Sequence, residues 1–273
     1  MFKKSILTGI IFSIAGNCFA SDTPKNTLIL QAGMSHIARQ DLVFSPFIHQ
    51  NISWMNFGFS YERNSKLIHR LAIRYGGFSP MLSSTYEFSK DGKNETAYPH
   101  SFTMIDIDYI IGKSIKNSSK ASTIIGGAFS TDIQALNYVY GRISSFGYYS
   151  ALGIGLFAKQ NFEITDKHGL FASIQIPLAA WYARSPYLVN DDEFIENISS
   201  HSGFKSFLSF MGDGKVVTLN RLQSVDFQLG YKYSFNKKWQ LGADYMLEFI
   251  HASQPRNLLS YRQSVNLSAH FSF

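Results

Sequence analysis

The C-terminal part of the chain alternates between apolar and polar residues with a period of two, and this pattern restricts the fold more than any other feature. In the last segment, Val265 and Leu267 fall on one face of an extended strand, and Asn266 between them falls on the other. The same alternation covers residues 225–235 and 239–249. A helix would need apolar residues three and four positions apart, where these segments carry charges. They therefore predict β-strands with one apolar and one polar face.

Seven earlier segments alternate in the same way, which gives an even total of ten strands. The runs are about 11–16 residues long, whereas strands of soluble β-sandwiches usually have about five or six residues and transmembrane barrel strands about 10. We therefore predict an all-β fold, a transmembrane antiparallel up-and-down β-barrel of about ten strands. The seven segments are residues 27–35, 52–62, 67–78, 102–115, 123–135, 148–164 and 170–182.

Some details of this assignment stay open. Residues 138–140 and 216–219 can extend neighbouring strands or form a further hairpin, which would give 12 strands. Pro177 interrupts the segment 170–182 and cannot donate a ladder hydrogen bond. We expect a bulge there, with the alternation shifted by one residue beyond it. Residues 191–199 favour a short helix.

The connections between the predicted strands are alternately short and long. Outer-membrane barrels have short periplasmic turns and longer extracellular loops, so this order predicts that both termini are periplasmic. The longest connection, residues 183–221, is expected either to fold against the lumen as a plug or lid, or to recognise a ligand or partner. The predicted turns are residues 64–66, 116–120, 165–169 and 236–238, and the predicted loops are residues 37–47, 79–100, 136–147, 183–221 and 253–258.

The first twenty residues have the pattern of a secretory signal peptide. Lys3 and Lys4 precede an apolar run over residues 5–15, and small residues at Cys18 and Ala20 favour cleavage before residue 21. We expect a signal peptide at residues 1–20 and one barrel domain at residues 21–273. Cys18 is the single cysteine, so the exported product would have no disulfide, cysteine–zinc site or cysteine nucleophile. Its net charge would fall from +6 to about +4, which does not favour a nucleic-acid partner.

Together, the signal segment, the alternating strands and the terminal aromatic residues Phe271 and Phe273 resemble Gram-negative outer-membrane β-barrel proteins. The resemblance covers the whole mature chain and implies a location in the outer membrane, in contact with outer-membrane lipid and lipopolysaccharide. It also implies that the barrel-assembly machinery reads Phe271 and Phe273 as an assembly signal. It names a class of protein and implies no particular activity.

Aromatic residues gather near the predicted strand ends, as in the two interfacial girdles of a barrel. The expected girdles are Tyr61, Tyr233, Phe235, Trp239 and Phe273 on the periplasmic side, and Tyr75, Tyr148, Tyr182, Phe249 and Tyr261 on the extracellular side.

The inward face collects charges of both signs. A barrel of about ten strands encloses little free space, so we expect these charges to pair across the lumen as a network rather than to line a wide pore. Glu163 falls on the same face at its periplasmic end. The predicted lumen charge network is Glu62, Arg70, Arg74, Asp106, Asp108, Asp132, Lys159, Asp226, Lys232, Asp244, Glu248 and Arg262.

Asp106 and Asp108 are the sharpest candidates for acid–base chemistry, because a spacing of two places both carboxylates on one face of a strand. Ten-stranded omptin proteases resemble this arrangement, but they carry an acidic pair and an Asp–His pair near the extracellular mouth. Here Asp166 and His168 fall in a predicted periplasmic turn, so we expect salt bridges from Asp106 and Asp108 to Arg70 or Arg74. The pairs His100–Ser101 and His201–Ser202 suggest a hydrolase, but neighbouring strand residues point to opposite faces.

The sequence therefore predicts no catalytic, cofactor-binding or metal-binding residues. The favoured function is non-enzymatic: a structural or surface-interaction role, with the long extracellular loops meeting an unknown extracellular ligand. Two alternatives stay open. One is a narrow pore for small polar solutes, and the other is an outer-membrane lipid or peptide hydrolase acting at the extracellular rim.

Overall fold

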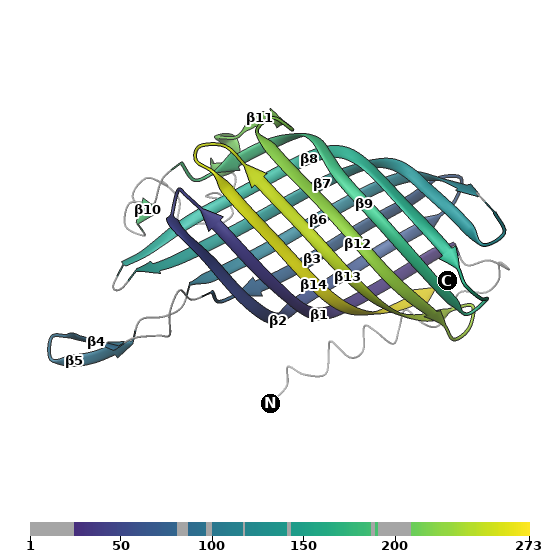
Figure 1. The fold of residues 1–273 in the computed structure, drawn as a ribbon, viewed down its shortest axis with the longest axis horizontal. Helices are drawn as coiled ribbons and strands as arrows, with labels where there is room; N and C mark the ends of the chain where they lie inside the picture. The colour runs from purple at the N-terminus through teal and green to yellow at the C-terminus, as the bar shows by residue number, and fades with distance from the viewer. Residues whose placement is uncertain are drawn as a thin grey trace, which may run out of the picture.

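Ten antiparallel strands form a closed barrel in the computed structural model (Figure 1). The structure describes residues 25–80, 87–96, 100–116, 118–140, 143–186, 189–190 and 209–273, so the expected signal peptide and the expected helix at residues 191–199 lie outside it. Strand β1 pairs with β14 and closes the barrel, which confirms the predicted up-and-down architecture. The strands are β1 (Asn26–Asp41), β2 (Ser45–Asn64), β3 (Ile68–Phe78), β6 (Ser101–Lys116), β7 (Ala121–Tyr140), β8 (Ile143–Glu163), β9 (His168–Arg184), β12 (Leu222–Ser234), β13 (Trp239–Ala252) and β14 (Leu258–Ser272).

Four short strands lie outside this set of ten. β4 (Glu87–Lys90) and β5 (Lys93–Thr96) form a separate hairpin, in which Asp91 and Gly92 both have positive φ, as a two-residue I′ turn requires. β10 (Val189–Asn190) pairs with β8, and β11 (Lys215–Thr218) pairs with β9. Residues 138–140 therefore extend β7, and residues 216–218 add to the sheet without making a 12-stranded barrel.

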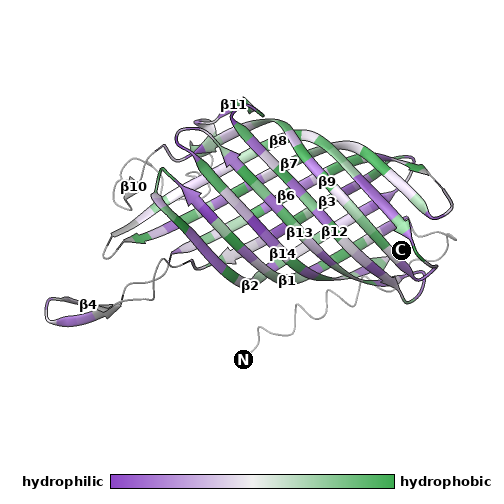
Figure 2. Cartoon of the chain, in the orientation of Figure 1, coloured by the Kyte–Doolittle hydropathy of each residue, from purple (hydrophilic) through white to green (hydrophobic). Residues whose placement is uncertain are grey.

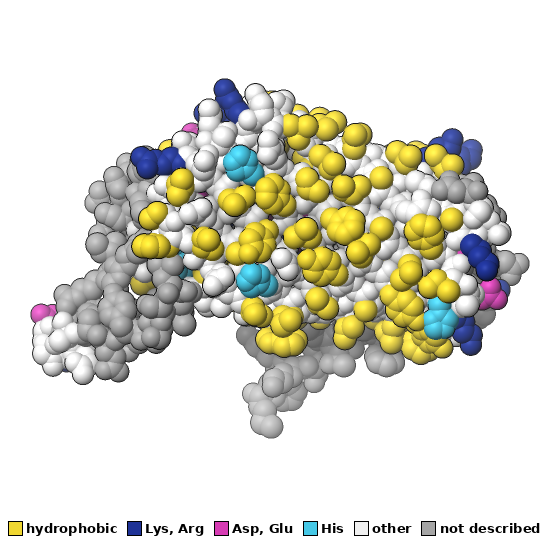
Figure 3. Space-filling view, in the orientation of Figure 1, with side chains coloured by type: hydrophobic (Ala, Val, Ile, Leu, Met, Phe, Trp, Pro, Cys, Tyr) yellow, Lys and Arg dark blue, Asp and Glu magenta, His cyan; other side chains and the backbone are white. Residues whose placement is uncertain are grey.

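Along the barrel wall, apolar side chains point outward and polar side chains point inward. In β14, Leu267 is 71% exposed, whereas Asn266 and Ser268 on either side are buried. Figure 2 shows the resulting bands of alternating hydropathy along each strand, and Figure 3 shows apolar side chains spread over the visible outer wall. Such a wall suits contact with acyl chains rather than with water. Among the described residues, no helix is long and apolar enough to cross a membrane.

The two ends of the barrel differ. We call the end with the turns 65–67, 164–167 and 235–238 the turn end, and the opposite end the loop end. Lys25 and Phe273 lie at the turn end, because Asn26 bonds to Phe273 and Asn64 to Lys25.

The predicted strict alternation of short turns and long loops is wrong. Residues 42–44, 141–142 and 253–257 make three short connections at the loop end, and only residues 79–100 and 185–221 remain long there. The strands continue through most of two stretches that we expected to be loops, residues 37–47 and 136–147. Toward the loop end, apolar side chains also occupy the inner face beside buried charges, so the pattern that marks a membrane strand weakens.

The inward apolar side chains give the loop end a hydrophobic core inside the barrel. Ile37, Leu136 and Leu258 point inward there and are fully buried. Burial of such side chains stabilises by about 1.5–3 kcal/mol each. Two clusters fill this end: Ile37, Phe44, Phe78, Phe102, Met104, Leu136 and Tyr138 in one, and Tyr149, Ala151, Ala180, Tyr182, Val217, Leu222, Ile250, Ala252 and Leu258 in the other.

A bulge in β9 confirms the irregularity expected at Pro177. Gly155 pairs with Pro177 and Ile154 with Ala179, so Leu178 is an extra residue without a partner on β8. Beyond it the inward residues change from odd to even numbers. Tyr182, which we expected on the outer girdle, therefore points inward, where its hydroxyl donates to the Gln254 carbonyl oxygen at 3.0 Å.

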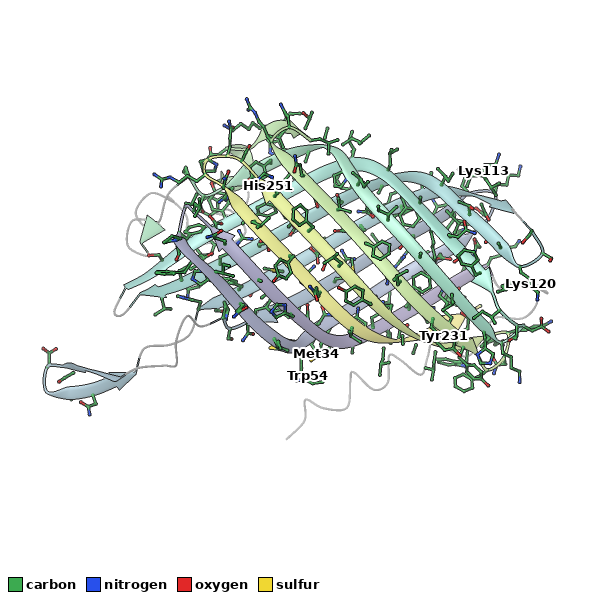
Figure 4. The ribbon with its side chains drawn as sticks, in the orientation of Figure 1. Met34, Trp54, Lys113, Lys120, Tyr231 and His251 are labelled. Atoms are coloured by element: carbon green, nitrogen blue, oxygen red, sulfur yellow. The ribbon has the colours of Figure 1, made fainter. Side chains whose placement is uncertain are left out.

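A second bulge, in β2, was not anticipated. Gly33 pairs with Asn56 and Ser35 with Ser53, so Trp54 and Met55 both lie opposite a single residue of β1. Both side chains face outward, with exposed fractions of 75% and 53%, and Figure 4 shows Trp54 on the outer surface.

Candidate functional site: the charged lumen

The charged residues of the lumen fall into four levels along the barrel axis. The structure places all twelve residues of the predicted network on the inner face, whereas Glu163 is exposed at the turn end of β8. Seven belong to a central network: Arg74, Asp106, Asp108, Asp132, Asp226, Glu248 and Arg262. Four belong to a turn-end cluster, Glu62, Arg70, Lys159 and Lys232, and Asp244 lies between the two groups.

Arg262 is the centre of the central network. Its guanidinium forms ion pairs with Glu248 on the neighbouring strand β13 and with Asp106 on β6. β6 is not adjacent to β14 in the sheet, so the Arg262–Asp106 pair crosses the bore. All three side chains are buried. A buried guanidinium that contacts two carboxylates satisfies most of its donors and ties opposite walls together.

Arg74 on β3 extends the same network. Its Nη2 lies 3.1 Å from Asp108 Oδ2, 3.3 Å from Glu248 Oε1 and 3.9 Å from Asp226 Oδ2, and its Nε lies 3.6 Å from Asp106 Oδ2. Four carboxylates thus share two arginines at this level, and the fifth, Asp132, accepts a hydrogen bond from Gln134. The central network has a formal excess of negative charge.

The next level toward the turn end is held by amides. Asp244 accepts hydrogen bonds from Gln31, Gln228 and Asn266, each at 3.0 Å. Asn266 in turn accepts from Asn56 at 2.6 Å. Neutral donors therefore satisfy this buried carboxylate without an arginine or lysine, which the sequence pattern of charges did not indicate.

A fourth level, at the loop end, was not predicted from the sequence. Arg39 Nη2 lies 2.9 Å from Asp41 Oδ2, and its Nη1 donates to Gln134 Oε1 at 2.6 Å. Arg184 also pairs with Asp41, and donates to the Arg256 carbonyl oxygen at 2.7 Å. We had assigned these charges to loops. Continuing the odd-numbered inward parity of β1 past residue 35 would have found Arg39 and Asp41.

Side chains occupy most of the bore at the central level. Two small cavities of about 50 and 30 Å³ adjoin the network and share Arg74, Asp108 and Asp226 in their walls. A cavity of about 10–15 Å³ holds one water molecule, so each of these holds only a few. The described residues thus form a polar core with room for isolated waters.

The residues considered for hydrolysis do not come together. Asp106 and Asp108 are held by arginines, as expected for Arg74 although not for Arg70. His100 is buried and accepts a hydrogen bond from the Val139 amide at 2.8 Å, while Ser101 is exposed on the opposite face.

The remaining candidates are separated from this level. His168 lies at the turn end, where it hydrogen-bonds the Tyr231 hydroxyl, and the pair His201–Ser202 lies outside the described residues. Within the described part of the chain, no group of three or more His, Cys, Asp or Glu residues could hold a metal ion.

Comparison with known proteins adds information about the fold. No family model matches the chain, and no curated protein matches it. The crystal structure of the outer membrane protease OmpT from Escherichia coli is similar over 95% of this chain and 99% of that chain, with a TM-score of 0.58 and 7% identity. Neisserial surface protein A matches 90% of this chain and 97% of its own, with a TM-score of 0.36 and 12% identity. The toluene transporter TodX of Pseudomonas putida matches 93% and 90%, with a TM-score of 0.34 and 11% identity.

The likeness to OmpT shows that this chain has the fold of outer-membrane β-barrel proteins. At 7% identity it carries no catalytic residues over. The other two likenesses have TM-scores too low to support an argument.

Proposed function

We propose that this protein is a non-conducting outer-membrane β-barrel of a Gram-negative bacterium, with a structural or surface-interaction role at its extracellular end. The fold and the apolar outer wall support the membrane location. With short turns and the chain termini on the periplasmic side, the loop end faces outward from the cell.

The observation that carries the proposal is the cross-linked bore. Arg262 and Arg74 reach carboxylates on other walls of the barrel, and the adjoining cavities hold only a few waters. An ion or solute would have to separate buried ion pairs to pass, and breaking such a pair costs about 3–5 kcal/mol. A barrel filled in this way supports a function outside the lumen.

The loop end supports a role as a rigid surface. β7 and β8 have 20 and 21 residues, whereas about 9–11 residues span a membrane as a strand. The additional length is packed around the two hydrophobic clusters, so the barrel would project above the membrane as a solid body.

Part of the longest connection adds to this projecting surface. Phe210 stacks on Tyr148 of β8 with ring centroids 4.0 Å apart, and Trp181 donates from Nε1 to the Met211 carbonyl oxygen at 2.7 Å. Tyr148 and Trp181 are on the outer parity of their strands. Phe210 and Met211 therefore lie on the outside of the wall, whereas β11 continues the wall and its Val217 packs in the inner cluster. The outer part of this connection supports a role in recognition.

Planar-bilayer recording tests the proposal. The purified mature protein should give no discrete conductance steps at a dose that inserts many copies. Regular steps would support the narrow pore instead. Turnover of phospholipid, lipopolysaccharide or peptide that disappears in Asp106→Asn would support the hydrolase.

A binding assay separates the two roles at the surface. Protein in nanodiscs should bind a component of a glycan and protein array, and replacement of the β4–β5 hairpin by a short Gly–Ser turn should weaken that binding. A correctly folded barrel that binds no component would favour the purely structural role.

The C-terminal strand is also proposed to carry the assembly signal. Phe271 lies 4.8 Å from Trp239 and 5.9 Å from Phe273, measured between ring centroids, so the aromatic side chains form one exposed edge at the turn end. Deletion of Phe273 should reduce insertion by the barrel-assembly machinery in cells while leaving the stability of the refolded barrel almost unchanged.

A further inference from the structure

The turn-end cluster brings three cations together around one carboxylate. Arg70 on β3, Lys159 on β8 and Lys232 on β12 face the lumen with Glu62 on β2, and Glu62 interacts electrostatically with all three cations. We propose that this cluster binds a small phosphate-type oxyanion that enters through the turn end of the barrel.

The position of the cluster makes it reachable from that end. Arg70 is two residues from the turn-end limit of β3, and Lys232 and Glu62 are two residues from the corresponding limits of β12 and β2. Lys159 is four residues from the end of β8. At about 3.3 Å per residue, all four lie close to the mouth, on the far side of the amide level from the central network.

The two lysines converge on a single aromatic ring. The Nζ atoms of Lys159 and Lys232 lie 4.8 Å and 5.1 Å from the centroid of the Phe171 ring on β9. Gly230 makes room for this ring, because a Cβ there would lie 2.2 Å from a ring carbon of Phe171. Cation–π contacts thus hold the two ammonium groups near each other. The two groups repel each other, and a bound anion would relieve this repulsion.

The cations of this cluster form no close salt bridge in the described structure, although Arg70 lies opposite Glu62 in the β2–β3 register. None of the ion pairs within 4.0 Å involves Arg70, Lys159 or Lys232, and Arg70 Nε is buried without a hydrogen-bond partner. Lys159 is 7% exposed. With Glu62 ionised, the cluster has a formal charge of +2, and burying such charge is unfavourable unless it is paired or hydrated.

A phosphate-type oxyanion fits the donors that are present. Arg70 offers a planar fork of N–H groups, and each lysine offers an ammonium from another wall of the barrel. A tetrahedral anion can accept hydrogen bonds from several directions at once, whereas the single Glu62 carboxylate sits on one wall only. Free phosphate and the phosphate group of a larger periplasmic ester share this chemistry.

Calorimetric titration of the full mature protein in detergent tests the inference, at constant ionic strength. Inorganic phosphate should bind saturably, and chloride should not. Glycerol 3-phosphate distinguishes the source: tighter binding than inorganic phosphate identifies a phosphate ester, and weaker binding identifies the free anion. Lys159→Met and Lys232→Met should each weaken binding roughly tenfold or more, as expected for a lost charged hydrogen bond.

Lysines outside the cluster provide matched controls. Lys113 and Lys120 are exposed near the same end of the barrel (Figure 4), and Lys113→Met and Lys120→Met should bind phosphate as the natural protein does. Absence of saturable binding, an equal response to chloride, or equal loss in the control variants would overturn the inference.

Glu62→Gln gives a change in the opposite direction, which misfolding cannot imitate. Removal of the competing carboxylate should tighten phosphate binding, and unchanged or weaker binding in a folded Glu62→Gln barrel would contradict the site. The inference is independent of the proposed function, because an anion at the turn end is compatible with either a sealed or a conducting barrel.

Discussion

The central network and the turn-end cluster both combine acidic and basic side chains on the inner face of the barrel, yet they differ in pairing. In the centre, Arg74 is the cross-strand partner of Asp106, and Arg262 is the partner of Glu248. At the turn end, Arg70 lies opposite Glu62, but Lys232 lies opposite Gly169 and Gly242. Lys159 lies opposite Ile124 and Ser173. Strand register thus leaves the two lysines without an acidic cross-strand neighbour, and the excess positive charge can recruit a ligand.

Removal of Arg262 should have the largest effect on stability. Arg262→Met leaves Asp106 and Glu248 buried beside a single shared arginine, and we expect a loss of about 3–5 kcal/mol of unfolding free energy. Denaturant unfolding of the barrel in detergent or vesicles measures it. Arg63→Met, at an exposed position of the turn end, is the matched control and should change little. Equal losses in both variants would contradict a network that holds the walls together.

A charge on the outer wall tests the cost of a charge that has no partner in the membrane. Leu267→Arg places a cation in the apolar outer band without a partner, and should cost about 2–4 kcal/mol. Leu259→Arg, near the loop end of the same strand, should cost about 0–1 kcal/mol. The same unfolding measurement applies. A larger loss for Leu259→Arg than for Leu267→Arg would show that the membrane band is assigned to the wrong part of the strand.

Neutralising one carboxylate in each region should give effects of opposite sign. Glu62→Gln removes the carboxylate from among three cations and should destabilise by about 1–2 kcal/mol in phosphate-free buffer. Asp226→Asn removes one of four carboxylates that share two arginines, and should leave stability unchanged or raise it by up to about 1 kcal/mol. If Glu62→Gln and Asp226→Asn both destabilised the barrel, the proposed difference in charge balance between the two regions would be wrong.

The smallest effect is expected for a cation of the turn-end cluster. Lys159→Met is the same kind of substitution as Arg262→Met, but it removes an unpaired charge and leaves an apolar side chain beside Phe171. We expect stability to stay within about 1 kcal/mol of the natural protein or to rise. Lys120→Met serves as the exposed control. A loss as large as that of Arg262→Met would show that Lys159 has a structural partner.

Much of the fold could be predicted because a membrane wall imposes a strict pattern on the sequence. At the level of the lipid, one outward charge is costly, so Leu267 and Asn266 could be assigned to faces from parity alone. Above the lipid this constraint ends. There Ile37 and Arg39 both point inward, so apolar and polar residues no longer separate between the faces, and the sequence pattern predicts loops.

The pairing within the lumen was less accessible. Parity places Arg262, Asp106 and Glu248 on the same face, but the contact between Arg262 and Asp106 depends on the curvature that brings β6 across from β14. The β2 bulge at Trp54 and Met55 could not be predicted, because it contains no proline, unlike the bulge beside Pro177. The partners of Asp244 could not be predicted from the pattern of charges either, because its hydrogen-bond donors are uncharged amides.

The unpaired Leu178 has a consequence for tracing the descent of this protein. A relative that lacks the extra residue would keep Arg184 inward only by compensating elsewhere in β9, since a one-position slip exchanges the two faces. Alignments should open a single-position gap at this point. Insertions and deletions tolerated in evolution are therefore expected to accumulate beside Pro177 rather than in the evenly paired β13 and β14.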